Sequence, residues 1–164
     1  MATPLGHSIV GYTLARAAGV DSRGALALSM GAACLPDVDF LLGYVANGDF
    51  YSLHHEVITH KPAFPLLAGL ATAAVAGIAA FGRGRRPRLS ELFKPAALVT
   101  ALVGSHIIMD HLPIPYDSEP PRSNRIAEVF AAHGWNTVID FAVYGTLAAL
   151  VLERNGVNGK TATA

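Results

Sequence analysis

The chain has 164 residues, of which 52% are hydrophobic and 15% are charged, and its mean hydropathy is +0.39. Soluble domains usually carry about 25% charged residues, so this composition is typical of a one-domain integral membrane protein. The net charge is zero, which gives no electrostatic reason to expect nucleic acid as a partner. Cys34 is the single cysteine, which excludes an internal disulfide and any zinc motif built on several cysteines.

Five apolar stretches follow one another along the chain. Residues 8–20 and 24–45 are rich in Ala and Gly, and Pro36 breaks the second stretch because proline removes a backbone donor and clashes with the preceding turn. Residues 63–81 carry no charge and approach the roughly 20 residues needed to cross a bilayer. Residues 95–112 and 136–152 complete the set.

These stretches predict an all-α fold, a small integral-membrane bundle of about four to five apolar helices. We expect residues 1–152 to form one helical membrane domain and residues 153–164 to form a flexible polar tail. A soluble helical enzyme is the alternative. It would need a continuous polar face on residues 63–81, and the sequence there offers almost none.

The charged residues separate when the helices are drawn as an up-and-down bundle. One end collects most of the cations, namely Arg16, Arg23, Arg83, Arg85, Arg86, Arg88, Lys94, Arg154 and Lys160. By the positive-inside rule, the arginine-rich loop and the C-terminus are expected in the cytoplasm, with the protein in the inner membrane. The opposite, extracytoplasmic end collects every histidine and most of the carboxylates.

Candidate metal ligands fall into one layer at that opposite end. His106 and Asp110 are four residues apart and project from one helix face, and such groups within an apolar run are costly unless paired, metal-bound or facing a polar cavity. Inward-facing imidazoles and carboxylates are how helical bundles build metal sites. The candidate ligands are His7, Asp37, Asp39, His55, His60, His106, Asp110 and Asp140. The mixed set suits zinc, with manganese or iron as alternatives, and one to three ions.

Several further residues lie next to these candidates. Thr59 and Ser105 each precede a candidate ligand histidine and could orient its imidazole. His54 and His111 are interpreted as interfacial or supporting residues rather than ligands. Asp39 could bridge two ions or act as the catalytic general base.

Taken together, these elements resemble the YdjM-type family of membrane-bound, metal-dependent hydrolases. The resemblance rests on the joint order of His7, Pro36-Asp37-Val38-Asp39, the pair His55 and His60, Ser105-His106 with Asp110, and a late Asp140. It implies hydrolysis by a metal-activated water. The position of the layer in the bilayer adds the expectation of a membrane lipid or membrane-associated ester or phosphoester as substrate.

Two other functions stay open. A non-catalytic membrane protein could use the metal to hold the bundle together or to sense ion supply. A metal or proton transporter would need a polar path across the membrane. The candidates instead lie in a single layer, which disfavours transport.

Overall fold

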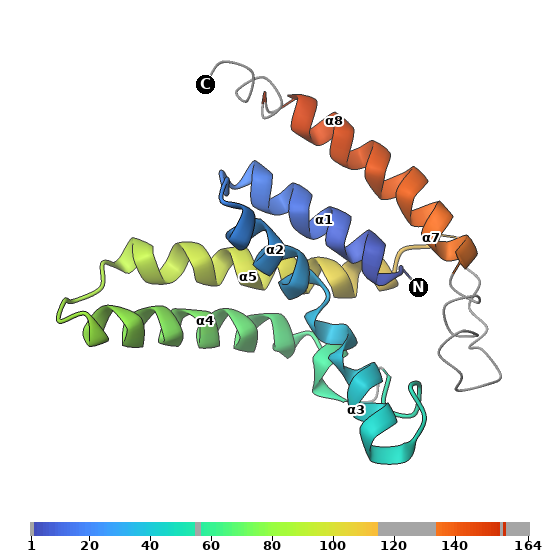
Figure 1. Ribbon diagram of the computed structural model, residues 1–164, viewed down its shortest axis with the longest axis horizontal. Helices are drawn as coiled ribbons and strands as arrows, with labels where there is room; N and C mark the ends of the chain where they lie inside the picture. The colour runs from blue at the N-terminus through green and yellow to red at the C-terminus, as the bar shows by residue number, and fades with distance from the viewer. Residues whose placement is uncertain (1, 55–56, 115–133, 155, 157–164) are drawn as a thin grey trace.

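The computed structural model describes residues 2–54, 57–114, 134–154 and 156. These residues form helices and turns and contain no strand. Long helices lie beside one another in a bundle, with shorter helices at one end (Figure 1). The all-α fold predicted from the sequence is therefore confirmed.

The first helix, α1 (Pro4–Ala17), begins earlier than the sequence suggested. Thr3 before it has an extended backbone, and Pro4 occupies the first turn, where its missing N–H is no loss. Gly19, just beyond the helix, adopts a left-handed backbone with φ of 81°. The helix therefore spans Pro4–Ala17, and the expected start at residue 8 is wrong.

The predicted break at Pro36 is present. α2 (Arg23–Ala33) is capped at its N-terminus by Ser22, whose hydroxyl accepts a hydrogen bond from the amide of Ala25 at 3.2 Å. It is followed by the 3-10 turn η1 (Leu35–Asp37) and by α3 (Val38–Asn47), and the two halves meet at 58°. A second 3-10 turn, η2 (Ile58–His60), precedes the next long helix.

α4 (Ala63–Gly82) and α5 (Leu89–Asp110) form an antiparallel hairpin (Figure 1). Their contact requires a glycine, because a Cβ on Gly69 would lie 2.9 Å from the carbonyl oxygen of Ala96. The start expected for α5 at Pro95 is wrong. Glu91 accepts a hydrogen bond from the amide of Arg88 at 2.9 Å, which fixes the start at Leu89 and leaves Pro95 inside the helix.

The last segment is one helix with an irregular middle. α7 (Gly134–Asp140) runs into the π-helical stretch η3 (Phe141–Gly145) and then into α8 (Thr146–Arg154). It extends two residues into the predicted tail. The other tail residues lie outside the described part of the chain except Gly156, so the domain and tail boundary stays a prediction.

In the described part of the chain, three helical segments are long and apolar enough to cross a membrane, and the bent pair Arg23–Ala33 and Leu35–Asn47 brings the number to as many as four. They are Ala63–Gly82, Leu89–Asp110 and Gly134–Arg154. Large apolar side chains point outward, as Ile78 and Val75 do on α4, with exposures of 72% and 66%. A lipid environment satisfies such surfaces, so the protein is a helical membrane bundle.

Candidate metal centre

One end of the bundle brings together four separate elements. α1 begins there, α5 ends there, and the turns η1 and η2 lie between α2 and α4. The arginine-rich turn between α4 and α5 lies at the far end of the hairpin (Figure 1). Because His7 is in the first turns of α1 and Asp110 closes α5, the helix ends themselves set the level of the site.

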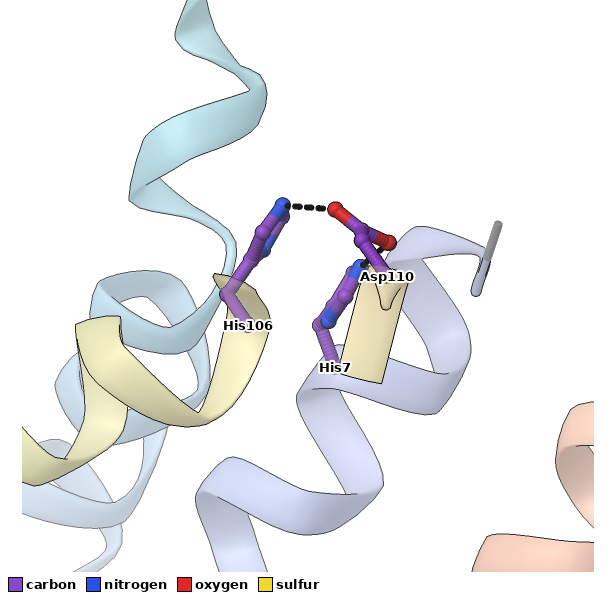
Figure 2. A group of neighbouring side chains, drawn as sticks. All are labelled: His7, His106 and Asp110. Atoms are coloured by element: carbon purple, nitrogen blue, oxygen red, sulfur yellow. Dashed lines mark ion pairs between the residues drawn. The ribbon is translucent and has the colours of Figure 1, made fainter. Parts of the chain in front are cut away.

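The first group of candidate ligands consists of His7, His106 and Asp110 (Figure 2). Nε2 of His7 lies 3.5 Å from Oδ1 of Asp110, and Nε2 of His106 lies 3.2 Å from Oδ2. The two imidazole rings are stacked, with centroids 3.5 Å apart. Both histidines are fully buried, and the Asp110 side chain is 2% exposed. Two imidazoles and one carboxylate thus converge on one point inside the protein.

The orientation of His106 is fixed by a backbone contact. Its Nδ1 lies 2.8 Å from the carbonyl oxygen of Ala33. Because a carbonyl can only accept, Nδ1 carries the hydrogen, and the neutral ring directs the lone pair of Nε2 at Asp110. A lone pair facing a carboxylate is unfavourable unless a proton or a cation lies between them.

Several buried polar atoms of this group have no hydrogen-bond partner among the described residues. They are both ring nitrogens of His7, Nε2 of His106 and both carboxylate oxygens of Asp110. Buried polar atoms are satisfied in the great majority of cases, so a cluster of orphaned atoms requires an explanation. Nitrogen and oxygen donors aimed at one point fit a bound divalent cation, and zinc, manganese and iron accept this ligand set.

A second group shares His106 with the first. It contains Asp37 from η1, His60 from η2 and His106 from α5. Oδ1 of Asp37 lies 3.3 Å from Nε2 of His106, and Nε2 of His60 lies 3.7 Å from Oδ2 of Asp110. The Asp37 side chain is 12% exposed, against 2% for Asp110, so solvent reaches the cluster on the Asp37 side.

A third group is centred on the buried carboxylate of Asp39. Nδ1 of His54 lies 3.1 Å from Oδ1, and Nδ1 of His60 lies 2.8 Å from Oδ2. The Thr59 hydroxyl donates to the same Oδ2 at 3.2 Å and lies 3.4 Å from Nδ1 of His60. Both oxygens of Asp39 therefore face groups that orient it, and the supporting role predicted for Thr59 stays a prediction.

His54 lies in this third group, and its contact with Asp39 is compatible with the interfacial or supporting role that the sequence suggested. Its ring stacks on Phe40, with centroids 3.9 Å apart, which turns Nδ1 towards Asp39. The sequence feature that could have indicated this contact is Phe40, the aromatic residue that follows Asp39 in α3. Only the turn after α3 brings His54 back to them.

Charge in the cluster is visible in the protonation of His60, which lies outside the membrane-spanning segments. Burial lowers the pKa of His60, but the carboxylates of Asp110 and Asp39 outweigh burial and raise it to about 9. Without a metal ion, His60 is therefore protonated at neutral pH. A metal ligand must be deprotonated, so a cation that binds there displaces this proton.

The structure does not bring every predicted residue into these groups. The buried carboxylate of Asp140 accepts hydrogen bonds from the Thr3 amide at 2.6 Å and the Thr3 hydroxyl at 2.5 Å, so it ties α7 to the start of α1. His55 lies outside the described residues. Ligand roles for these two residues stay predictions.

Two predicted supporting residues make contacts within their own helix. The Ser105 hydroxyl donates to the carbonyl of Leu102 at 2.7 Å, and Nδ1 of His111 donates to the carbonyl of Ile107 at 2.7 Å. His111 is exposed, and its interfacial or supporting role stays a prediction. The carbonyl of Ala33 orients His106 instead, and no sequence pattern marks a backbone acceptor of this kind.

Apolar helices, a helix end crowded with buried imidazoles and carboxylates, and a separate arginine-rich end define a small helical membrane protein with a candidate metal centre. The family model of the YdjM inner membrane proteins matches residues 1–120, and the chain belongs to this family. The matched part contains all three groups of candidate ligands and ends before α7. Neither the curated proteins nor the solved structures compared with the chain include a significant match.

Proposed function

We propose that this protein is a membrane-embedded metal-dependent hydrolase that cleaves an ester or phosphoester of a lipid or of another membrane-associated substrate. The observation that carries the proposal is the buried cluster of His7, His106 and Asp110, whose orphaned donor atoms converge on one point. A hydrolytic metal site needs such ligands together with a side open to substrate, and the Asp37 side offers one.

The first and second groups share His106, and the second and third share His60, which favours adjacent ions over a single isolated one. His7, His106 and Asp110 would hold one ion, and Asp37 and His60 would hold its neighbour. Zinc suits these donors, with manganese or iron as alternatives. When bound, such an ion supplies the Lewis acidity that brings the pKa of water towards neutrality and polarises a carbonyl or phosphoryl oxygen.

We assign different roles to the carboxylates of Asp39 and Asp37. Asp39 keeps His54 and His60 in place, because its two oxygens face their Nδ1 atoms. Asp37 is the partly exposed carboxylate of the cluster, so its free oxygen can accept a proton from water on the substrate side. Asp39, which the sequence suggested as general base, is fully buried and is better suited to orienting imidazoles.

The placement of the site relative to the membrane belongs to the same proposal. The arginine-rich turn at residues 83–88 and the end of α8 would face the cytoplasm, and the cluster would lie near the extracytoplasmic face. A site at that level meets lipid head groups, whose ester and phosphoester bonds are the chemistry proposed here.

A second candidate is a non-catalytic metal protein. The cluster connects α1, η1, η2 and α5, so a bound ion would also fasten one end of the bundle. Transport is less favoured. Among the described residues, the buried ionisable side chains include His7, Asp39, His60, His106, Asp110 and Asp140, and all of these belong to the site end.

Metal content and turnover separate these candidates. Detergent-purified wild type is compared with His106→Ala and with His111→Ala, which removes an exposed imidazole from the same helix end. We expect wild type and His111→Ala to retain metal and to hydrolyse p-nitrophenyl phosphate, p-nitrophenyl acetate or a vesicle lipid. His106→Ala should lose both properties. Tight metal binding without turnover of any ester would favour the non-catalytic candidate.

A further inference from the structure

A groove lies between α1 and the last helix, outside the metal chemistry described above. It encloses about 120 Å³. Its walls include Val10, Leu14 and Ala17 on α1 and Tyr144, Ala148 and Val151 on η3 and α8. All but Tyr144 are purely apolar side chains, so the groove is suited to hydrocarbon.

The hydroxyl of Thr13, which also lines the groove, does not make it polar. Thr13 donates a hydrogen bond to the carbonyl of Ile9 at 2.7 Å, so its hydroxyl is used within α1. What Thr13 adds to the wall is its methyl group. A groove with such a lining excludes charged and strongly hydrated ligands.

On α1 the groove starts close to the metal centre. Val10 is three residues after His7 and Ala17 is ten residues after it, which places the wall roughly 5 to 15 Å along the helix from His7. Leu14, at i+7 from His7, lies on the same helix face. The groove therefore runs down α1 from the level of the candidate ligands.

The residues of the opposite wall are also spaced along one face of a helix. Tyr144, Ala148 and Val151 lie four, eight and eleven residues after Asp140, which is one face of a helix. Tyr144 is buried in a cluster with Met109, the neighbour of Asp110. Both walls thus begin beside the site and continue towards the arginine-rich end.

The surroundings of the groove indicate its occupant. The last helix is a candidate membrane span, and on it Leu147, which lines the groove, and Leu150 expose 52% and 59% of their surfaces. In a bilayer, hydrocarbon chains cover such surfaces. The size of the groove agrees, because an apolar cavity of about 150 Å³ holds one benzene molecule, whereas an α-helix with side chains is about 10 Å across.

We propose that the groove between α1 and α8 binds one acyl chain of a membrane phospholipid whose head group lies at the metal centre. This inference rests on the proposed function and narrows its substrate to a diacyl or monoacyl lipid. The groove takes several methylenes near the glycerol end, and the rest of the chain continues into the bilayer. The scissile bond is then an ester or phosphoester at the level of His7 and Asp110.

Photolabelling tests the groove without requiring turnover. Wild-type protein in phosphatidylglycerol vesicles is irradiated with a trace of phosphatidylglycerol that carries a diazirine in one acyl chain, and labelled peptides are located by mass spectrometry. We expect α1 and α8 peptides to be labelled at groove residues. Ala148→Trp, which fills the groove, should lower this labelling about tenfold, since several buried methylenes are lost.

Ala149→Trp is the matched control, because Ala149 is the exposed neighbour on the same helix and does not line the groove. It should leave labelling unchanged. Ala17→Trp fills the groove from the other wall and serves if Ala148→Trp fails to fold. Equal labelling in wild type and in the folded groove-filling variant would overturn the proposal, as would crosslinking of the groove to a second copy of the chain.

A paired hydrolysis assay separates this inference from the proposed function. If both are right, His106→Ala loses hydrolysis but keeps groove labelling, and Ala148→Trp loses turnover of phosphatidylglycerol whereas Ala149→Trp keeps it. If no variant hydrolyses any ester while labelling follows the groove, the proposed function fails and the acyl site stands. If hydrolysis persists but labelling is equal in wild type and in the groove-filling variant, the acyl site is wrong and the proposed function stands.

Discussion

Single hydrogen bonds decide which nitrogen each buried imidazole presents to the candidate centre. The carbonyl of Ala33 takes the Nδ1 hydrogen of His106, and the carboxylate of Asp39 takes that of His60. In both rings the remaining nitrogen, Nε2, is directed at Asp110. Such contacts fix the orientation of each ring, so under the proposed function the cost of ordering the ligands would be met by the fold and not by the ion.

The Thr59 hydroxyl gives a direct test of this pre-orientation. Thr59→Val keeps the shape of the side chain but removes the donor to Asp39. We expect metal affinity to fall about 10- to 100-fold, as it does when outer hydrogen bonds of metal ligands are removed. The measurement is competition of the purified protein against a zinc-binding dye.

Thr59→Ser is the control for this substitution, because it restores the hydroxyl without the methyl group. It should recover most of the affinity that Thr59→Val loses. If the two variants bind zinc equally, the hydroxyl does not orient Asp39 or His60, and the positioning role is wrong.

Much of the cluster could be predicted from residue types and their sorting to one end. His7, Asp37, His60, His106 and Asp110 are expected ligands that the structure brings together, although no bound ion tests their role. The contact between His54 and Asp39 could not be predicted, because it depends on the chain turning back towards α3 so that the His54 ring stacks on Phe40. The contacts of Asp140 with Thr3 depend likewise on packing between distant segments.

Among the elements, the hairpin of α4 and α5 is the packing unit on which His106 and Asp110 depend. Gly69 and the small side chain of Thr100 allow the two helices to approach closely. Close approach through small residues is the usual basis of helix association in membranes, where no hydrophobic force favours one helix contact over lipid.

Gly69→Ala should therefore weaken this hairpin. The added Cβ collides with Thr100 Oγ1 and lies 2.9 Å from the carbonyl oxygen of Ala96, which cannot move without bending α5. Overpacking of this kind costs about 1–3 kcal/mol. In a chain of this size the unfolding midpoint should fall by roughly 2–4 °C per kcal/mol, measured by thermal unfolding in detergent.

Gly77→Ala is the matched control in the same helix. A Cβ there meets only the end of the Leu92 side chain, at 3.7 Å, which is an ordinary contact. Its midpoint should not fall. Equal midpoints for Gly69→Ala and wild type would mean that the hairpin is not closely packed at Gly69.

The approximate positions of the helices could be predicted from hydropathy, but the residues at which they begin and end could not. The break at Pro36 was predictable because proline cannot continue the hydrogen-bond ladder of a helix. The same reasoning failed at Pro95, where the carboxylate of Glu91 starts α5 earlier and the helix tolerates the proline. The π-helical stretch Phe141–Gly145 has no marker in the sequence that single-residue preferences would detect.

At the scale of the whole molecule, opposite ends of the bundle carry opposite chemistry. One end holds the buried imidazoles and carboxylates, and the other holds the exposed arginines of the turn between α4 and α5. Arg85 pairs with Glu91 there, in an exposed ion pair that contributes little to stability. The arginines therefore bear on membrane orientation more than on folding.

Membrane orientation can be tested at the two ends of α5. In a Cys34→Ser background, Leu112→Cys places a thiol at the site end and Arg86→Cys places one at the arginine end. We expect a membrane-impermeant maleimide to label Leu112→Cys in intact spheroplasts. Arg86→Cys should react only after the membrane is opened, because the positive-inside rule predicts that the arginine end faces the cytoplasm. The reverse pattern of labelling would contradict the proposed topology.

The origin of the ligands in the chain also constrains how the protein is made. His7 enters the membrane with the first helix, but Asp110 and His106 follow only when α5 is complete. Until then the imidazole of His7 lacks the carboxylate that faces it in the finished protein. A chain made only as far as α4 lacks His106 and Asp110, so under the proposed function metal would be loaded only after α5 has been inserted.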